Sequence, residues 1–226
     1  MSSLKLVIGN KNYSSWSLRP WFFLKNLEID FEEELVWLFE DDTEIKLKPY
    51  FSDSKVPLLI DSNVQLANGE PLQVWDSLAI IEYIADTSKA GWPQDAASKA
   101  IARSISAEMH SGFADLRNAL PMNCKKHFPN YPITNEVQQD INRIVNIWEY
   151  CRKNSKSAAS SNLWLCGEFS GVDAMFAPVV MRLIGYDVEL NGFAKDYTQM
   201  VLENPFMQEW IEAGKLEMHV INEDEA

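Results

Sequence analysis

Two short stretches decide the fold: Lys55-Val56-Pro57-Leu58-Leu59-Ile60 and, further along the chain, Val74-Trp75-Asp76-Ser77. The first places a proline at the start of a short strand, where its missing N–H is tolerated and a cis bond is plausible. A cis turn would leave the backbone N–H and C=O of Val56 free to pair with an extended peptide. We therefore interpret this stretch as a strand that begins beside a peptide-binding edge.

The second stretch ends at Asp76-Ser77, and the apolar residues that follow keep helical spacing as far as Ala85. Asp76 or Ser77 is therefore the expected N-cap of a helix. A helix N-terminus attracts a carboxylate, and an acidic side chain beside it can pair with an ammonium. One zwitterionic amino-acid end would satisfy both groups.

A third stretch, Ser14-Ser15-Trp16-Ser17, lies near the N-terminus. The alternation of Leu4, Leu6 and Ile8 predicts a strand, followed by a polar loop and then apolar residues at helical spacing. Pro20 is tolerated only in the first turn of that helix, which therefore begins around residues 15–17. The serines then lie at the positive end of the helix.

The chain as a whole is expected to be an α/β thioredoxin-like N-terminal domain of order βαβαββα, followed by an all-α C-terminal domain. Further strands are expected at 31–38, 57–61 and 72–75, with a short helical connection at 43–51. The predicted divisions are a thioredoxin-like domain at 1–86, a linker at 87–97 and a helical domain at 98–226.

Helical spacing predicts one continuous helix over 97–120, ended by Pro121. Thr134 is expected to cap the next helix, and Ser170-x-x-Asp173 resembles a capping box that opens another. A final helix is expected from Pro205. Residues 155–162 read as a serine- and alanine-rich loop, and 222–226 as a frayed acidic tail.

Composition excludes several classes of protein. The chain has 226 residues, 46% of them hydrophobic, a formal charge of −13 and a pI near 4.7. The negative charge argues against nucleic acids and anionic membranes as partners. No apolar run reaches the roughly 20 residues that span a bilayer, and no signal-peptide pattern is evident, so a cytoplasmic location is expected. Three scattered cysteines and three scattered histidines suggest neither a disulfide framework nor a metal site.

The three stretches resemble the N-terminal domain of the cytosolic glutathione S-transferase superfamily. In that family a cis Val-Pro holds the cysteinyl backbone of glutathione, and an acidic residue followed by serine holds its γ-glutamyl end. Val56-Pro57 and Asp76-Ser77 match these positions. The serine stretch followed by Arg19 looks most like the serine-type classes, especially the zeta class that includes maleylacetoacetate isomerase. Residues 169–178 match a motif of the family's helical domain.

The resemblance implies a dimeric enzyme that uses glutathione as co-substrate and needs no metal. It also implies that the domain at 1–86 binds glutathione and that the helical domain at 98–226 forms the pocket for the second substrate. Only the thiolate of a thiol, whose pKa is about 8.5, is a good nucleophile, so a serine hydroxyl at a helix N-terminus would stabilise it. Ser14 is the first choice for this donor, and Ser15 and Ser17 are the alternatives. Lys55 could reach the glycyl carboxylate. The candidates for binding a small electrophile are Met109, His110, Phe113 and Arg117.

Trp16 departs from the zeta pattern, which has a cysteine between the serines, and this places isomerase activity in doubt. The absence of a cysteine from the serine stretch argues against thiol–disulfide chemistry. A glutathione transferase is therefore favoured. Maleylacetoacetate isomerase stays open as an alternative, as does a non-catalytic binding protein with the same fold, which abundant exposed aromatic residues would favour.

Overall fold

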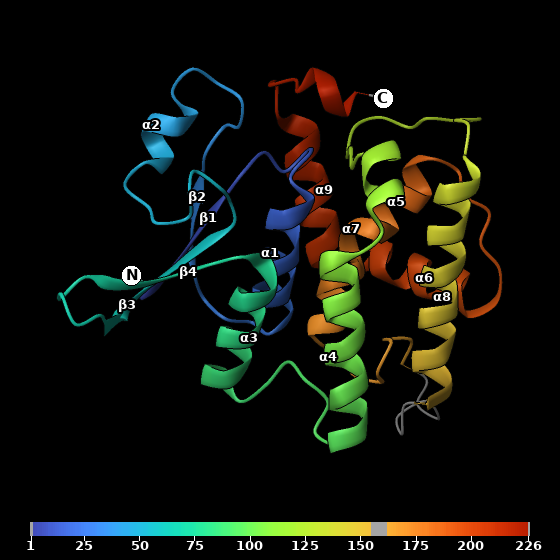
Figure 1. Cartoon of the computed structure of the whole chain (residues 1–226), viewed down its shortest axis with the longest axis horizontal. Helices are drawn as coiled ribbons and strands as arrows, with labels where there is room; N and C mark the ends of the chain where they lie inside the picture. Colours follow the sequence, from blue (N-terminus) through green and yellow to red (C-terminus); the bar gives the residue numbers. More distant parts are fainter. Residues whose placement is uncertain (1, 155–161, 226) are drawn as a thin grey trace.

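The computed structural model describes residues 2–154 and 162–225. A four-stranded sheet lies at one side of the molecule, and helices make up the rest of it (Figure 1). The strand order is β2-β1-β3-β4, with β1 parallel to β2 and antiparallel to β3, and β3 antiparallel to β4. The elements of this part are β1 (Leu4–Ile8), α1 (Ser15–Asn26), β2 (Glu32–Leu35), α2 (Thr43–Leu47), β3 (Leu58–Gln65), β4 (Pro71–Trp75) and α3 (Ser77–Ser88).

The order βαβαββα confirms the predicted thioredoxin-like fold. Successive side chains of a strand point to opposite faces, so the sheet contributes to two clusters. Leu6, Ile8 and Leu59 join the large core that α1 and α3 share with the helical part. Val7 and Leu58 join a smaller cluster on the opposite face, beneath α2.

The remainder is mostly helical, and α7 runs through its middle (Figure 1). Helix α7 packs against α1, α4 and α8, and nearly all of its residues are buried. It therefore ties the sheet-containing part to the outer helices. The elements are α4 (Ala96–Ser111), α5 (Ala114–Ala119), α6 (Asn135–Asn154), α7 (Gly171–Gly185), α8 (Gly192–Glu203), α9 (Pro205–Leu216) and a 3₁₀ turn (Asn222–Asp224).

The prediction of one helix over 97–120 is wrong, because the chain breaks between α4 and α5. Phe113 has a left-handed φ of 59° and is buried. The break directs Leu116 into the core, and its backbone N–H donates to the Asp140 carboxylate of α6 at 3.0 Å. A partner from another helix thus satisfies an amide that the break removes from the helix ladder.

The predicted helix caps are confirmed. One Asp76 oxygen accepts the N–H groups of Leu78 and Ala79 at 2.9 and 3.1 Å. At the start of α7, the Asp173 carboxylate accepts the backbone N–H of Ser170 at 2.9 Å, as a capping box requires.

The prediction of a frayed tail is wrong for the residues described. The Glu225 carboxylate accepts the Tyr13 hydroxyl at 2.6 Å and the Asn123 amide at 3.1 Å, and it pairs with Lys126. The C-terminal segment is therefore docked against the loop before α1. Helix α8 was not predicted, and the predicted loop at 155–162 lies outside the described residues except for Asn162.

Candidate functional site

A cleft of about 890 Å³ opens between the serine stretch and the helical part. Residues 13–16 form one wall, and residues within 38–44, apart from Asp42, form the other together with 54–56. Helix α5, the segment after it, Arg182 of α7 and the C-terminal segment close the far side. Volumes of this order accommodate a small-molecule ligand.

Ser14 lines this cleft and caps the N-terminus of α1. Its hydroxyl lies 2.8 Å from that of Ser17 and accepts the Ser17 backbone N–H at 3.4 Å. Ser17 is fully buried and also accepts the N–H of Gly9 at 3.1 Å. A contact between two hydroxyls works with either as donor. Ser17 can therefore donate to Ser14 while Ser14 donates to a ligand.

Ser15 also lines the cleft, but its hydroxyl accepts an N–H of Arg182 at 3.1 Å. The same guanidinium donates to the backbone oxygens of Arg117 and Leu120. Arg182 thus joins the serine stretch to the end of α5. Burial lowers the pKa of Arg182 to about 10, which leaves the guanidinium charged at neutral pH.

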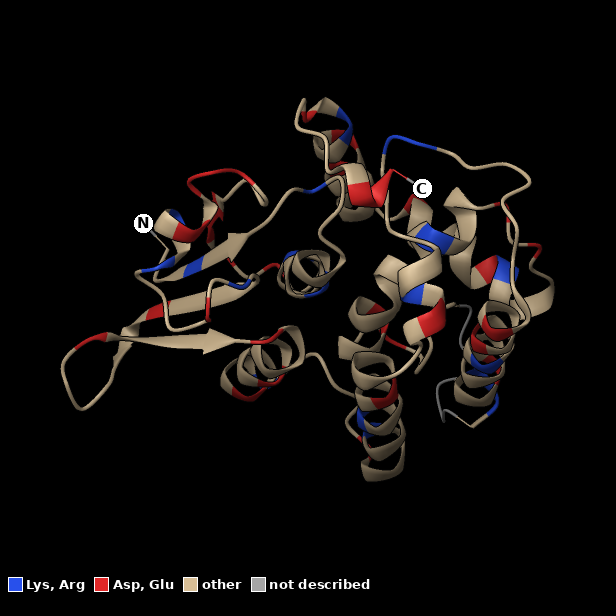
Figure 2. Cartoon of the chain, turned by 45° about the horizontal axis from the view of Figure 1, so that its top comes forward, with Lys and Arg blue, Asp and Glu red and all other residues tan. Residues whose placement is uncertain are grey.

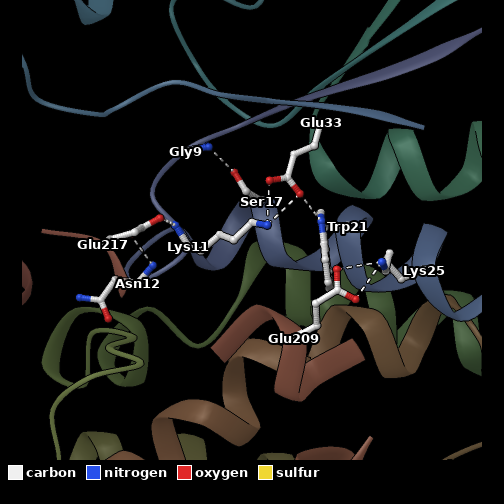
Figure 3. Close-up of polar contacts among 9 residues, drawn as sticks. All are labelled: Gly9, Lys11, Asn12, Ser17, Trp21, Lys25, Glu33, Glu209 and Glu217. Atoms are coloured by element: carbon white, nitrogen blue, oxygen red, sulfur yellow. Dashed lines mark hydrogen bonds and ion pairs between the residues drawn. The ribbon is translucent and has the colours of Figure 1, made fainter. Parts of the chain in front are cut away.

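The loop before α1 is held by a network of charged side chains (Figure 3). The Lys11 ammonium pairs with Glu33 of β2 at 2.7 Å and lies 5.1 Å from the ring centre of Trp21. The Trp21 indole N–H donates to the same carboxylate at 2.6 Å. The network fixes the chain that leads into Ser14.

The C-terminal segment holds the loop from the other side. The Glu217 carboxylate accepts the backbone N–H groups of Lys11 and Asn12 at 2.6 and 3.0 Å (Figure 3). Gly214 of α9 permits this approach, because a Cβ there would lie only 3.1 Å from the Asn12 nitrogen. His219 contacts the Asn10 amide at 2.9 Å. Sequence reasoning missed Glu217, which no local motif marks.

On the opposite wall, the Val56–Pro57 bond is cis. Val56 lines the cleft, and its backbone N–H and C=O hydrogen bond to none of the described residues. Pro57 is buried beneath it. Lys55 lines the cleft too, and its ammonium pairs with Asp53 at 3.5 Å, with both side chains largely exposed.

Asp76 and Ser77 lie beside the cleft rather than among the residues that line it. The second Asp76 oxygen pairs with His110 of α4 at 3.1 Å. Asp76 has an unusual φ of 76°, and Ser77 is almost fully buried. His110 in turn contacts the edge of Trp16, which lines the cleft, with ring centres 5.4 Å apart. The α3 N-terminus therefore adjoins the cleft through these two rings.

Trp16 also stacks with two guanidinium groups. Those of Arg19 and Arg117 lie 4.2 and 5.4 Å from its ring centre. Arg19 is buried, and it lies 3.5 Å from the Ser77 hydroxyl. Burial, together with the charges of Arg182 and Arg117, lowers the pKa of Arg19 to about 9. Arg19 follows the serine stretch that was compared with the serine-type classes. Sequence reasoning did not name it as a site residue, and its contacts with Trp16 and Ser77 appear only in the folded chain.

Of the residues expected to contact a second substrate, Arg117 lines the cleft. Met109 and Phe113 are buried in the core, and His110 contacts Asp76. The structure therefore brings Ser14, Ser15, Lys55, Val56 and Arg117 to one cleft and places the other candidates behind or beside it.

Acidic residues occur on both the sheet-containing part and the helical part (Figure 2). Within the cleft, Asp224 lies near Arg182; burial raises the pKa of this carboxyl and the guanidinium opposes the shift. Over residues 2–154 and 162–225, no group of three or more potential ligands could hold a metal ion. Among the helices described there, none is long and apolar enough to cross a membrane.

Comparison with known proteins identifies the fold that carries this cleft. Residues 13–87 match the family model for the glutathione S-transferase N-terminal domain. The chain has the glutathione transferase fold. A search of curated protein sequences finds no match.

Solved glutathione transferases extend the fold over nearly the whole chain. Glutathione S-transferase unclassified 2 from Bombyx mori is 18% identical, with a TM-score of 0.70 over 95% of this chain and 94% of that one. An enzyme from Burkholderia graminis, solved with two glutathione molecules per subunit, is 19% identical, with a TM-score of 0.65 over 96% and 90%. One from Pseudomonas putida, solved with glutathione disulfide, is 21% identical, with a TM-score of 0.60 over 93% and 91%.

Proposed function

We propose that this protein is a glutathione transferase of the serine type, which presents the glutathione thiolate to a small electrophile. The observation that carries the proposal is the cleft itself. It is lined by Ser14 at the N-terminus of α1 and, on the facing wall, by the unpaired backbone of Val56. The match of residues 13–87 to the family supports glutathione as the ligand.

Ser14 is the proposed thiol donor. A hydrogen bond to the thiolate contributes roughly 1.5–3 kcal/mol, and the N-terminus of α1 adds roughly 0.3–1 kcal/mol. These energies correspond to a depression of the thiol pKa by about one to two units. When Ser14 donates to sulfur, the Ser17 hydroxyl 2.8 Å away can donate to Ser14 and support the charge. Serine need not ionise.

The peptide part of glutathione would span the region from Val56 to Asp76. The Val56 backbone would pair with the cysteinyl backbone, with Pro57 fixing the turn. Asp76 would pair with the γ-glutamyl ammonium in place of His110, and Ser77 would bind the γ-glutamyl carboxylate. Lys55, exposed at the cleft, would reach the glycyl carboxylate.

Conjugation is favoured over isomerisation of maleylacetoacetate, because the indole of Trp16 occupies the position of the zeta-class cysteine and forms part of the cleft wall. Net consumption of glutathione separates the two reactions. Turnover of maleylacetoacetate without consumption would instead support the isomerase.

We also propose that the protein is a cytoplasmic homodimer, as the resemblance implies. Phe51 and Trp75 form an exposed ring pair with centres 5.1 Å apart, which could contribute to such an interface. Light scattering of the purified protein tests the dimer, and a monomer at micromolar concentration would contradict it.

Calorimetric titration with glutathione tests the site. We expect the parent to bind and Asp76→Ala to bind at least about tenfold more weakly, because it loses a charge-assisted contact. Asp76 also caps α3, so thermal unfolding must show that the variant is folded. Absence of binding to the well-folded parent would overturn the proposal in favour of the non-catalytic binding protein, whose surface would include the exposed Phe39, Phe51, Trp75 and Tyr150.

A further inference from the structure

We propose that the electrophile taken by this cleft carries a carboxylate and that Arg117 binds it. This inference rests on the proposed function and adds a substrate class to it. It derives from the arginine side chains that surround Trp16, of which Arg117 lines the cleft without a carboxylate partner among the described residues.

Arg117 lines the cleft and is only partly buried. One of its N–H groups donates weakly to the His110 carbonyl at 3.4 Å, and its guanidinium lies over the Trp16 ring. Within the described residues, none of the ion pairs between a cation and a carboxylate involves Arg117. A guanidinium has five N–H donors, so most of those of Arg117 are free for a ligand in the cleft.

The two neighbouring arginines, Arg182 and Arg19, are not available to bind a substrate carboxylate. Arg182 is buried, and its terminal nitrogens donate to the Ser15 hydroxyl and to the backbone oxygens of Leu120 and Arg117, so it holds the wall together. Arg19 lies behind Trp16, against Ser77. Arg117 is therefore the guanidinium of this group that a substrate can reach.

The three arginines lie close enough together to repel one another: burial, and then the charges of Arg182 and Arg117, lower the pKa of Arg19, and the charge of Arg117 adds to the effect of burial in lowering that of Arg182. Asp76 offsets Arg19 and Asp224 offsets Arg182, whereas Glu40, Asp41 and Glu44 line the cleft on the wall at 38–44. Asp76 is already committed to the α3 cap and to His110. A charged side chain that is partly withdrawn from water is stabilised by an opposite charge beside it. An anionic ligand in the cleft would supply that opposite charge to Arg117.

The position of Arg117 relative to Ser14 suits this role. The backbone oxygen of Arg117 and the hydroxyl of Ser15 bind the same Arg182 guanidinium. The Arg117 guanidinium lies over Trp16, two residues from Ser14, and both Ser14 and Arg117 line the cleft, so a carboxylate held by Arg117 would share the cleft with the thiol. A forked guanidinium–carboxylate pair also fixes the orientation of the electrophilic carbon, which increases the rate of attack.

Glutathione has carboxylates of its own, and Arg117 could bind one of these instead. The structure favours the electrophile, because the proposed glutathione contacts lie on Val56 and at the N-terminus of α3, whereas Arg117 comes from α5. The experiment separates the two sources.

The test compares two electrophiles that share one reacting carbon: 4-(chloromethyl)benzoate and its methyl ester. In both, the glutathione sulfur forms a bond to the benzylic carbon, the C–Cl bond breaks, and chloride leaves with its electron pair. The thiol proton passes to the buffer. Each kcat/KM is divided by the rate constant of the uncatalysed reaction, which removes the intrinsic reactivity of the two compounds.

We expect the parent to prefer the carboxylate to the ester by at least about tenfold. Arg117→Met should lower that preference by about 10- to 100-fold, the range for loss of a charge-assisted hydrogen bond. Arg117→Lys should restore part of it. Arg143→Met removes the same charge from an exposed position on α6 that pairs with Glu108, and should leave the preference intact.

Three outcomes would overturn the inference. A parent that conjugates both compounds without preference overturns it and leaves the proposed function standing. An equal loss on both compounds in Arg117→Met, accompanied by a raised KM for glutathione, assigns Arg117 to glutathione. A parent that conjugates neither compound, nor other reactive halides, overturns the proposed function and this inference together.

Discussion

The wall of the cleft that carries Ser14 is tied down by buried hydrogen bonds, whereas the opposite wall, over residues 38–56, is largely exposed. On the first wall, the loop before α1 is held by Glu33, Glu217 and Glu225 from distant parts of the chain. In the segment at 38–56 that carries the second wall, Phe39, Ile45 and Phe51 are 79%, 71% and 75% exposed.

This difference indicates which part of the cleft needs a fixed geometry. Placing a hydroxyl against a thiolate requires fixed geometry, and a network of buried hydrogen bonds supplies it. A segment with few buried contacts opens locally at little cost in free energy. We therefore expect the wall at 38–56 to adapt to ligands while the serine wall stays in place. The following variants test this contrast.

The largest effect is expected for Glu217→Ala, which leaves the buried amides of Lys11 and Asn12 without an acceptor. The cost should be about 2–5 kcal/mol in the free energy of unfolding, measured by urea denaturation. Glu212→Ala, an exposed change one turn earlier in α9, should cost no more than about 0.5 kcal/mol. Equal effects of the two variants would show that the loop is held by other contacts.

Ser14→Ala should lower kcat/KM for glutathione conjugation about 10- to 100-fold, because the thiolate loses its proposed donor. Loss of the α1 cap should also cost about 1 kcal/mol of stability. The pH profile of kcat/KM decides the role, since its acidic limb should move to higher pH in the variant. A larger change in Ser15→Ala or Ser17→Ala would transfer the assignment to that serine.

Tyr13→Phe removes the bond between the loop and Glu225, and should cost about 1 kcal/mol near neutral pH. Burial, and then the bond to Glu225, raise the pKa of Tyr13 from 10.0 to about 12. The folded protein therefore holds this proton after the unfolded chain has released it, so the stabilisation is complete below pH 10 and is lost as pH rises through about 12.

Parallel urea titrations of parent and Tyr13→Phe at pH 8, 10 and 11 measure this loss as a narrowing difference in unfolding free energy. Tyr150→Phe, at an exposed position on α6, controls for removal of a phenol from the surface. A difference that widens with pH would contradict the assignment.

The smallest effect is expected for Phe39→Ala on the exposed wall. Because the ring is 79% exposed, its removal should change the free energy of unfolding by no more than about 0.5 kcal/mol. A loss above about 1 kcal/mol would show that this wall is held as firmly as the serine wall.

Local patterns predicted the elements around the site. Alternation at Leu6 and Ile8 specified a strand, and the short polar side chains Asp76 and Asp173 specified caps, because each acts on backbone groups within a few residues. The break at Phe113 was missed because both sides of it keep helical spacing. Gly112, the C-cap of α4, was a local signal for a helix end, and the contact with α6 completes the turn.

Long-range contacts account for the other differences. Glu217 binds a backbone 206 residues away, and Arg182 binds Ser15 across 167 residues. A local sequence pattern contains no information about contacts between residues so far apart in the chain. The acidic tail looked unstructured because its partners, Tyr13, Asn123 and Lys126, come from distant segments.

The sequence by itself determined the βαβαββα order and the cap at Asp76, because hydrophobic period and capping are properties of neighbouring residues. Short motifs and their resemblance to a known family supplied the candidate positions of Ser14 and Val56. Only the tertiary structure decided that Ser14, Val56 and Arg117 line one cleft and that Ser17 is buried behind it. It also decided that the C-terminal segment fixes the serine wall. Such contacts join residues whose proximity depends on how the helices pack, which no local pattern encodes.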